Sequence, residues 1–356
     1  MKTEFLLPAE WYPQDAILIT WPHEQSAWHS TLAEVEQTYF ELTSKLSHYQ
    51  PVIIQLHTSL DISPLLKVLA DGEANLSNCH FIRVNSNDTW ARDHGPIGVI
   101  GDNGITMLDF TFNGWGNKFE AQLDNSLNHN MSEQGCILRL QKVDWVLEGG
   151  SIESDGLGTI MTTENCVLNE NRNGHASRAD LETLFKDYFG AQHTVWLESG
   201  ELEGDDTDAH IDTLARFAPS NTIVFQGCQD TEDSHFPTLN AMKQELALAK
   251  NANGESFRLI ELPFPKAIFA DDGHRLPATY ANFLVTNKLV LVPVYGDSMD
   301  NEAMKLIAEA YPDHMVTSIN ARPLIEEHGS LHCITMQLPK GSVNFNAPFE
   351  QLKHSG

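Results

Sequence analysis

Basic residues are scarce in this chain of 356 residues, in which 22 Lys and Arg stand against 49 Asp and Glu, for a formal net charge of -27 at pH 7. Phosphate binding relies on clusters of Lys and Arg, so this deficit argues against nucleic acid and against an anionic membrane as partners. An acidic cleft would concentrate a cationic ligand, although an acidic surface also simply keeps a protein soluble. The charge therefore gives weak support to a small cationic partner.

Long hydrophobic runs and paired cysteines are also missing. No stretch approaches the roughly 18 to 20 apolar residues of a membrane span, and the N-terminus reaches Pro8 and Glu10 without the apolar segment of a secretion signal. The five cysteines are odd in number and form neither a CxxC pair nor a short disulfide framework. They are Cys79, Cys136, Cys166, Cys228 and Cys333. We therefore expect a cytoplasmic protein with reduced thiols.

Several common enzyme signatures have no counterpart in the chain. It contains no GxxxxGK[ST] phosphate loop, no GxGxxG dinucleotide loop and no GxSxG serine elbow. These absences argue against nucleotide-dependent enzymes and serine hydrolases.

What the chain does have is an alternation of strand and helix patterns. Short apolar runs rich in β-branched residues predict buried strands. The clearest are residues 16–20, 52–56, 222–226 and 289–294. Helical spacing of apolar residues follows Ser177 and Asp300, each a possible N-cap. The face expected behind Asp300 consists of Ala303, Met304, Ile307, Ala308 and Tyr311.

This alternation continues along the whole length without a low-complexity linker. It predicts one α/β domain that covers residues 1–356. The polar segment 229–235 and the proline-rich segment 262–277 are the expected long loops, and each either borders a cleft or is a plain surface excursion.

Five segments combine polar, aromatic and glycine residues at unusual density. They are residues 88–96 (DTWARDHGP), 112–118 (FNGWGNK), 147–151 (LEGGS), 204–212 (GDDTDAHID) and 328–335 (HGSLHCIT). In the first, Gly95 and Pro96 would end a strand in a tight turn. Asp93 is then either a turn-stabilising residue or a strand-end carboxylate that pairs with a guanidinium, to which Trp90 would offer its ring face.

The fourth segment spaces Asp208, His210 and Asp212 two residues apart. In an extended chain this spacing places the three side chains on one side. A calcium loop is excluded, because Ile211 and Phe217 replace the required glycine and glutamate. A zinc-dependent hydrolase stays an alternative, although no HExxH motif or cysteine pair accompanies these residues. A histidine placed for proton transfer fits better, and we expect no metal.

Cys333 follows His332 and begins an apolar run, residues 334–338, that predicts a strand. The usual explanation for such a cysteine is a buried, inert thiol. A nucleophilic thiol would need its pKa lowered by His332 or by a bound cation. The residues alone leave both interpretations open.

Together and in this order, these segments resemble the agmatine deiminase and bacterial-type peptidylarginine deiminase family of guanidine-modifying enzymes. The resemblance runs from Trp11 through WARDHGP, FNGWGN, LEGGSIESDGLGTIMTTENCVLN, NRN, GDDTDAHIDTLARF and YANFLVTN to LHCITMQLP. It implies the pentein fold, a five-bladed α/β propeller of ββαβ units with pseudo-fivefold symmetry and an active site in the central channel.

The resemblance also implies roles at the matching positions. Cys333 corresponds to the nucleophile, and His210 corresponds to the general acid and base. Asp93 and Asp212 correspond to the carboxylates that bind the guanidinium, and Glu148 to the carboxylate beside the histidine.

Further substrate contacts are implied around the aliphatic and amine portion of the ligand, at Trp90, Trp115 and Asp206. Many agmatine deiminases carry Glu where this chain has Asp206. His328-Gly-Ser replaces a glycine-richer loop, and Ala209 stands where glycine is common. Either departure could reshape the pocket.

The implied reaction is hydrolysis of agmatine to N-carbamoylputrescine and ammonia through an amidino-cysteine intermediate, a step of putrescine and polyamine biosynthesis. It needs no cofactor, its partner is a small cationic guanidine, and a homo-oligomer is compatible with the sequence. One alternative is a deiminase of free or peptidyl arginine that yields citrulline, for which Arg275 and Arg322 are available cations. The others are an amidinotransferase and a non-catalytic pentein that only binds a guanidinium.

Overall fold

The strands of the chain form five separate small sheets. The computed structural model describes residues 5–350, and the two ends of the expected domain, residues 1–4 and 351–356, lie outside the described residues. The first sheet has four strands in the order β16, β1, β2, β3, which are Thr335–Pro339, Gln14–Thr20, Val52–His57 and Cys79–Val84. Because β16 pairs with β1, segments from the two ends of the sequence share one sheet.

Each of the other four sheets has three strands. The second consists of β4 (Ile97–Gly101), β5 (Gly104–Thr111) and β6 (Leu140–Val146), and the third of β7 (Ile152–Ser154), β8 (Thr159–Thr163) and β9 (His193–Leu197). The fourth consists of β10 (Ala215–Ala218), β11 (Thr222–Gln226) and β12 (Arg258–Leu262), and the fifth of β13 (Leu284–Val285), β14 (Leu289–Val294) and β15 (Met315–Asn320). In every sheet an antiparallel pair of strands is followed by a parallel pair, and the first sheet has one more parallel pair, β2 with β3.

Parallel neighbours need a crossover connection, and helices supply it. The first sheet uses α1 (Leu32–Ser47) and α2 (Ile62–Asp71), and the second uses α5 (Leu127–Glu133). The third uses α6 (Glu164–Val167), α7 (Glu170–Asn173) and α8 (Arg178–Phe189), the fourth α9 (Phe236–Leu248) and the fifth α10 (Asp300–Ala310). Two single turns, α3 (Ala91–His94) and α4 (Gly114–Asn117), precede β4 and follow β5.

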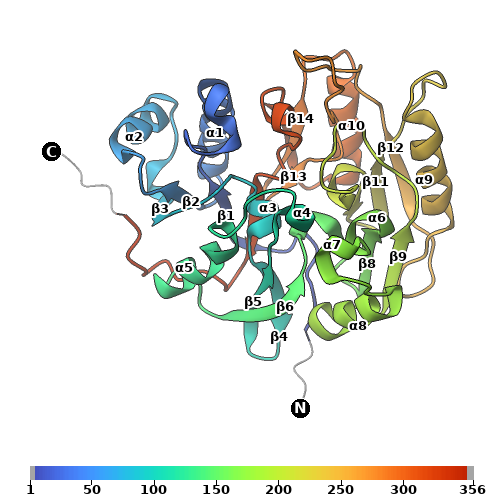
Figure 1. Cartoon of the computed structure of the whole chain (residues 1–356), viewed down its shortest axis with the longest axis horizontal. Coiled ribbons are helices and arrows are strands. Elements are labelled where there is room, and N and C mark those ends of the chain that lie inside the picture. The colour runs from blue at the N-terminus through green and yellow to red at the C-terminus, as the bar shows by residue number, and fades with distance from the viewer. Residues whose placement is uncertain (1–4, 351–356) are drawn as a thin grey trace.

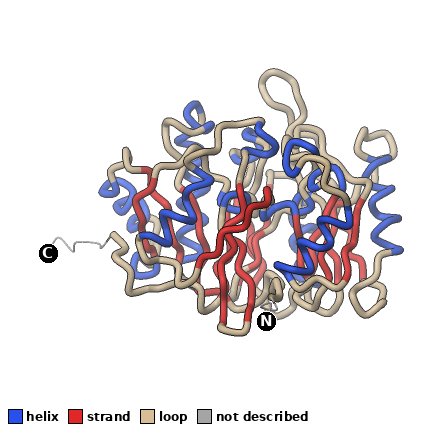
Figure 2. The backbone as a smooth tube through the Cα atoms, turned by 60° about the horizontal axis from the view of Figure 1, so that its bottom comes forward, coloured by secondary structure: helices blue, strands red, loops and turns tan. Residues whose placement is uncertain are grey.

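The sheets lie around α3, and the longer helices lie outside them (Figure 1). Figure 2 shows the same arrangement from a second direction, with helices flanking the strands. Within residues 5–350, no helix combines the length and apolar character that crossing a membrane requires.

The expected strands are present as β1, β2, β11 and β14. Ser177 caps α8 as expected, and a capping box with Asp180 completes that cap. Segments 229–235 and 262–277 connect elements as loops, apart from Leu262 at the end of β12 and an isolated bridge within the second.

The prediction for α10 was wrong in two details. Met299 is the N-cap and Asp300 is the first helical residue, because the Asp300 carboxylate accepts hydrogen bonds from Tyr280 and from the backbone ahead of the helix. Ala308 is exposed, because α10 packs through the row Ala303, Ile307 and Ala310.

Candidate active site

Four of the five chemically rich segments line one cleft, and the fifth, residues 147–151, contacts it from behind through the hydrogen bond from Gly150 to Asp93. The empty volume of the cleft, including its open mouth, is about 650 Å³. The lining includes Cys333, His210, Asp93, Trp90, Trp115 and Asp206, together with Asp88, Asp205 and Glu327. Residues far apart in the sequence therefore line one acidic depression.

Cys333 lies two residues before β16, and the expected strand 334–338 is confirmed from Thr335 onward. Its Sγ is 3.4 Å from Oδ1 of Asn282 and 3.7 Å from Oδ2 of Asp212. Burial, together with the carboxylates of Asp212 and Asp93, raises the pKa of this thiol well above its usual value. The thiol is therefore protonated at neutral pH in the substrate-free site.

Asp93 lies in the single turn α3 and not at the end of a strand, so that prediction was wrong. The turn forms because the amides of Asp93 and His94 both bond to the carbonyl of Trp90, and Gly95 then bonds to Ala91. The Asp93 carboxylate accepts hydrogen bonds from two other segments of the site. Burial raises its pKa to about 6, although the charge of His210 acts in the opposite direction.

Those two hydrogen bonds fix the carboxylate of Asp93. Oδ1 accepts from the backbone N–H of Gly150 at 2.9 Å, and Oδ2 accepts from Nε1 of Trp115 at 3.0 Å. Trp115 adopts a φ of 55°, between two glycines that also have positive φ. Trp115 lines the cleft, where a contact with the substrate was expected. Its hydrogen bond to Asp93 gives it a second role, which is to orient that carboxylate.

The segment around His210 is not extended, so the predicted period-two arrangement was wrong. Asp208 and Ala209 both have a φ of 67°, and residues 211–213 form a 3-10 turn. Asp208 pairs instead with Lys118 and Arg172, at 2.8 and 2.7 Å. The zinc alternative built on Asp208 therefore loses one of its ligands.

His210 lies between two carboxylates. Its Nδ1 is 3.6 Å from Oδ1 of Asp93, and its Nε2 is 3.9 Å from Oε2 of Glu148. Burial alone would lower the pKa of His210, but Asp93, the nearby sulfur of Cys166 and Glu148 hold this pKa well above its usual value. The histidine therefore carries a proton that it can donate.

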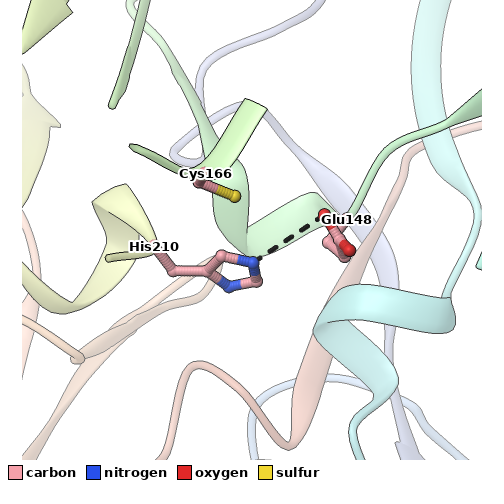
Figure 3. A group of neighbouring side chains, drawn as sticks. All are labelled: Glu148, Cys166 and His210. Carbon is pink, nitrogen blue, oxygen red and sulfur yellow. Dashed lines mark ion pairs between the residues drawn. The ribbon is translucent and has the colours of Figure 1, made fainter. Parts of the chain in front are cut away.

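Glu148, Cys166 and His210 form a compact buried group (Figure 3). The dashed line in Figure 3 marks the ion pair between His210 and Glu148. Arg172 donates from Nε to both carboxylate oxygens of Glu148, each at 2.9 Å. Burial would raise the pKa of Glu148, but His210 and Arg172 bring it below its usual value. Because Arg172 already occupies both oxygens, this group is better suited to proton transfer by His210 beside a charged carboxylate than to binding a metal ion.

Asp212 lies behind the cleft and is fully buried. Its Oδ2 is 2.7 Å from Nδ1 of His332, whereas its Oδ1 is one of the buried atoms without a hydrogen-bond partner in residues 5–350. Burial would raise the pKa of Asp212, but the hydrogen bond and the charge of His332 lower it. The ring of His332 faces carboxylates on both sides, so it does not activate Cys333 directly.

Two further residues at this site escaped the sequence-based assignment. Asn282 accepts hydrogen bonds from the backbone and the thiol of Cys333, and its own amide donates to the backbone of Asp212. Arg172 holds Glu148 as described. Asn282 lies in YANFLVTN and Arg172 in NRN, two of the motifs that carry the family resemblance. Membership of these motifs is the sequence feature that could have pointed to them.

The remaining expected substrate contacts line the outer part of the cleft. Trp90 donates from Nε1 to the carboxylate of Asp88 at 3.1 Å. Burial raises the pKa of Asp206, whose backbone carbonyl accepts a hydrogen bond from Lys118. The two cations considered as partners for the carboxylate of an arginine substrate lie outside the cleft. Arg275 is bonded to Asp233, and Arg322 is bonded to Glu326.

The chain is similar to known proteins over nearly its whole length. An agmatine deiminase of Pseudomonas putida is 31% identical over 94% of this chain and 95% of its own length. The solved structure of an agmatine deiminase of C. jejuni, a cysteine-to-serine variant with substrate bound, is 38% identical, with a TM-score of 0.87 over 95% of this chain and 97% of its own. The solved agmatine deiminase of Enterococcus faecalis is 26% identical, with a TM-score of 0.84 over 94% and 96%. A model of the Porphyromonas-type peptidyl-arginine deiminases matches residues 6–339, and the chain belongs to this family.

Proposed function

We propose that the chain is a cysteine-dependent deiminase that hydrolyses agmatine to N-carbamoylputrescine and ammonia. The observation that carries this proposal is the convergence of a thiol, a protonated imidazole and a carboxylate, from Cys333, His210 and Asp93, on one acidic cleft. A guanidinium is a poor electrophile because its charge is delocalised. Carboxylates that orient it and concentrate positive charge on its carbon lower that barrier.

The substrate would also ionise the nucleophile. The pKa of Cys333 is raised partly by the charges of Asp212 and Asp93, and a bound guanidinium neutralises those charges. The thiol then loses its proton to solvent beside the cation, and the thiolate attacks the guanidinium carbon. Ionisation and substrate binding are in this way coupled.

The proton on His210 completes the first half of the reaction. It passes to the amino group of the tetrahedral adduct, ammonia departs, and an amidino group stays bound to the sulfur of Cys333. His210, now neutral, takes a proton from water, which attacks the same carbon. The C–S bond breaks and the ureido product leaves. Glu148, held by Arg172, keeps the imidazole basic enough for both steps.

The charge of the cleft favours agmatine over arginine. Asp88, Asp206 and Glu327 line it, whereas neither Lys nor Arg does so among the described residues. The primary amine of agmatine suits these carboxylates, but the α-carboxylate of free arginine would meet like charges without a fixed cation. Trp90 and Trp115 supply apolar walls for the aliphatic chain between the two cationic ends.

The finer structural and cellular expectations belong to the same proposal. We infer that the five sheets, each an antiparallel pair followed by a parallel pair, are the blades of a pentein propeller with pseudo-fivefold symmetry in one domain. All five cysteines are free and buried, which supports a cytoplasmic location. The negative charge supports a small cationic partner and opposes nucleic acid. A homo-oligomer is compatible with these features.

Ammonia release by the wild type and by Cys333→Ser tests the function. The substrates are agmatine, free arginine, a blocked arginine ester and an arginine peptide. We expect release from agmatine, lost in the variant, and mass spectrometry of the substrate-treated protein should find the amidino adduct on Cys333. Release from an arginine derivative alone would leave the mechanism and change the substrate, and no release from any of them would point to a guanidinium-binding protein.

A further inference from the structure

The segment ahead of β1 places a carboxylate directly behind the reacting groups. Oε1 of Glu10 lies 2.5 Å from Nε2 of His332 and 3.4 Å from Nη1 of Arg92. Oε2 of the same residue pairs with Nη2 of Arg216. Glu10 therefore joins α3, β10 and the loop before β16, three elements that surround the site.

His332 continues this contact into the site. Its ring is 1% exposed, and Nδ1 lies 2.7 Å from Oδ2 of Asp212. Both contacts are within hydrogen-bond distance. The ring therefore links Glu10 on one side to Asp212 on the other.

The charged groups around the ring of His332 shift its pKa in opposite directions. Burial and the guanidinium groups of Arg216 and Arg92 lower the pKa of His332, whereas Glu10 and the bond to Asp212 act in the opposite direction. Glu153 on β7 pairs with Arg216 from the far side and takes up part of its charge. Because the Arg216 guanidinium fills the space between Glu10, Glu153 and His332, that cluster does not hold a metal ion.

The two carboxylate oxygens of Asp212 therefore have different surroundings. Oδ2 is tied to His332 and also faces the thiol of Cys333 at 3.7 Å. Oδ1 is buried without a partner within residues 5–350, which is costly for a carboxylate oxygen unless a ligand donates to it. Rotation of the carboxylate would exchange the two oxygens, and the bond from His332 opposes that rotation.

We propose, resting on the deiminase function above, that Glu10 and His332 are positioning residues of the reaction. Glu10 anchors the ring of His332, and the ring holds Asp212 with one oxygen free for the guanidinium and the other beside the thiol. Neither residue touches the substrate, and both act through Asp212. This carboxylate–imidazole–carboxylate chain reaches the thiol of Cys333 through Oδ2 of Asp212.

Two substitutions of His332 separate its two contacts. In His332→Asn the amide nitrogen lies near the position of Nδ1 and can still donate to Asp212, whereas in His332→Gln it lies near the position of Nε2 and can reach only Glu10. Glu10→Gln keeps the shape of the anchor without its charge. Glu36→Gln is the matched control. Glu36 lies on α1, outside the site, and also accepts a hydrogen bond from another side chain.

We expect kcat for ammonia release from agmatine to fall about 10- to 100-fold in His332→Gln and about 10-fold in Glu10→Gln, in the range found when supporting residues of a site are removed. His332→Asn should keep more activity than His332→Gln, and Glu36→Gln should match the wild type. Equal losses in the two His332 variants, or wild-type activity in His332→Gln, would overturn the proposal.

A second readout does not depend on the substrate. The rate of alkylation of Cys333 by iodoacetamide, followed by peptide mass spectrometry over a range of pH, reports the ionisation of the thiol. Without its bond from His332, the charge of Asp212 raises the thiol pKa further, so the profile of His332→Gln should move to higher pH. An unmoved profile, or faster alkylation from a loosened fold, would contradict the positioning role. If the wild type is inactive on agmatine, the proposed function fails, while this profile still decides the role of His332.

Discussion

Gly150 offers the sharpest test of the site geometry. A Cβ atom at this position would lie 2.6 Å from Nδ1 of His210, 2.7 Å from Oδ1 of Asp93 and 3.1 Å from Oδ2 of Asp212. The backbone φ of Gly150 is not positive, so alanine would fit the local conformation and only these contacts resist it. One methyl group therefore acts on three groups of the proposed machinery at once.

The size of the effect follows from these distances. Ordinary contact begins near 3.4 Å, so His210 or the backbone of Gly150 must move by about 0.8 Å. A misplacement of about 1 Å at reacting groups can cost about 100-fold in rate, which corresponds to about 2.7 kcal/mol of transition-state stabilisation. Overpacking itself destabilises a core by about 1 to 3 kcal/mol.

We therefore expect Gly150→Ala to lower kcat for agmatine by about 100-fold while the protein stays folded. Ammonia release gives the rate, and thermal unfolding separates it from loss of fold. Gly72→Ala is the control, because its Cβ would lie 3.3 Å from one backbone oxygen at an exposed helix end. A folded Gly150→Ala enzyme with activity within threefold of the wild type would refute the geometry of His210 and Asp93.

Three more predictions concern residues in the cleft and behind it. Gly329→Ala would place a Cβ 2.0 Å from the ring of Trp90, so we expect a KM for agmatine raised about 10-fold with a smaller change in kcat, since the loop or the ring must withdraw from the cleft. The pKa of Asp93 is raised to about 6, so kcat/KM should fall as the pH drops below about 6, where the carboxyl gains a proton and loses the guanidinium. A bound cation lowers that pKa, so the acid limb of kcat should lie at lower pH than that of kcat/KM; coincident limbs would argue against Asp93 as a guanidinium ligand. Arg172→Met leaves the buried carboxylate of Glu148 without its partner, and chemical denaturation should show a loss of about 3 to 5 kcal/mol in the free energy of unfolding; a loss below 1 kcal/mol would contradict the importance of this pair.

Residue composition was enough to predict the buried strands and to single out segments that the structure brings together. The strands at 16–20, 52–56, 222–226 and 289–294 followed from apolar runs, since both faces of such strands are buried. The segments that carry Asp93 and Cys333 were identified from their unusual residue content, and the structure brings both residues to one cleft.

The failures have a common physical origin, which is that local conformation depends on distant contacts. The period-two argument for residues 208–212 failed because two consecutive residues have positive φ, and Asp208 turns toward Lys118 and Arg172. Asn282 and Arg172 could not be assigned from spacing, because they lie 51 and 24 residues from Cys333 and Glu148, which they hold. Tertiary packing, and not local spacing, brings such partners together.

The pairing of β1 with β16 has a consequence for how the chain is made. The proposed nucleophile, Cys333, precedes β16, and the strand that receives β16 is synthesised more than 300 residues earlier. During translation β1 must wait with an open edge until the last strand emerges, an arrangement that slows folding and exposes the growing chain to aggregation. A ribosome that stops before residue 333 releases a polypeptide that lacks both the proposed nucleophile and the strand that completes the first sheet, so we expect partial products to be inactive.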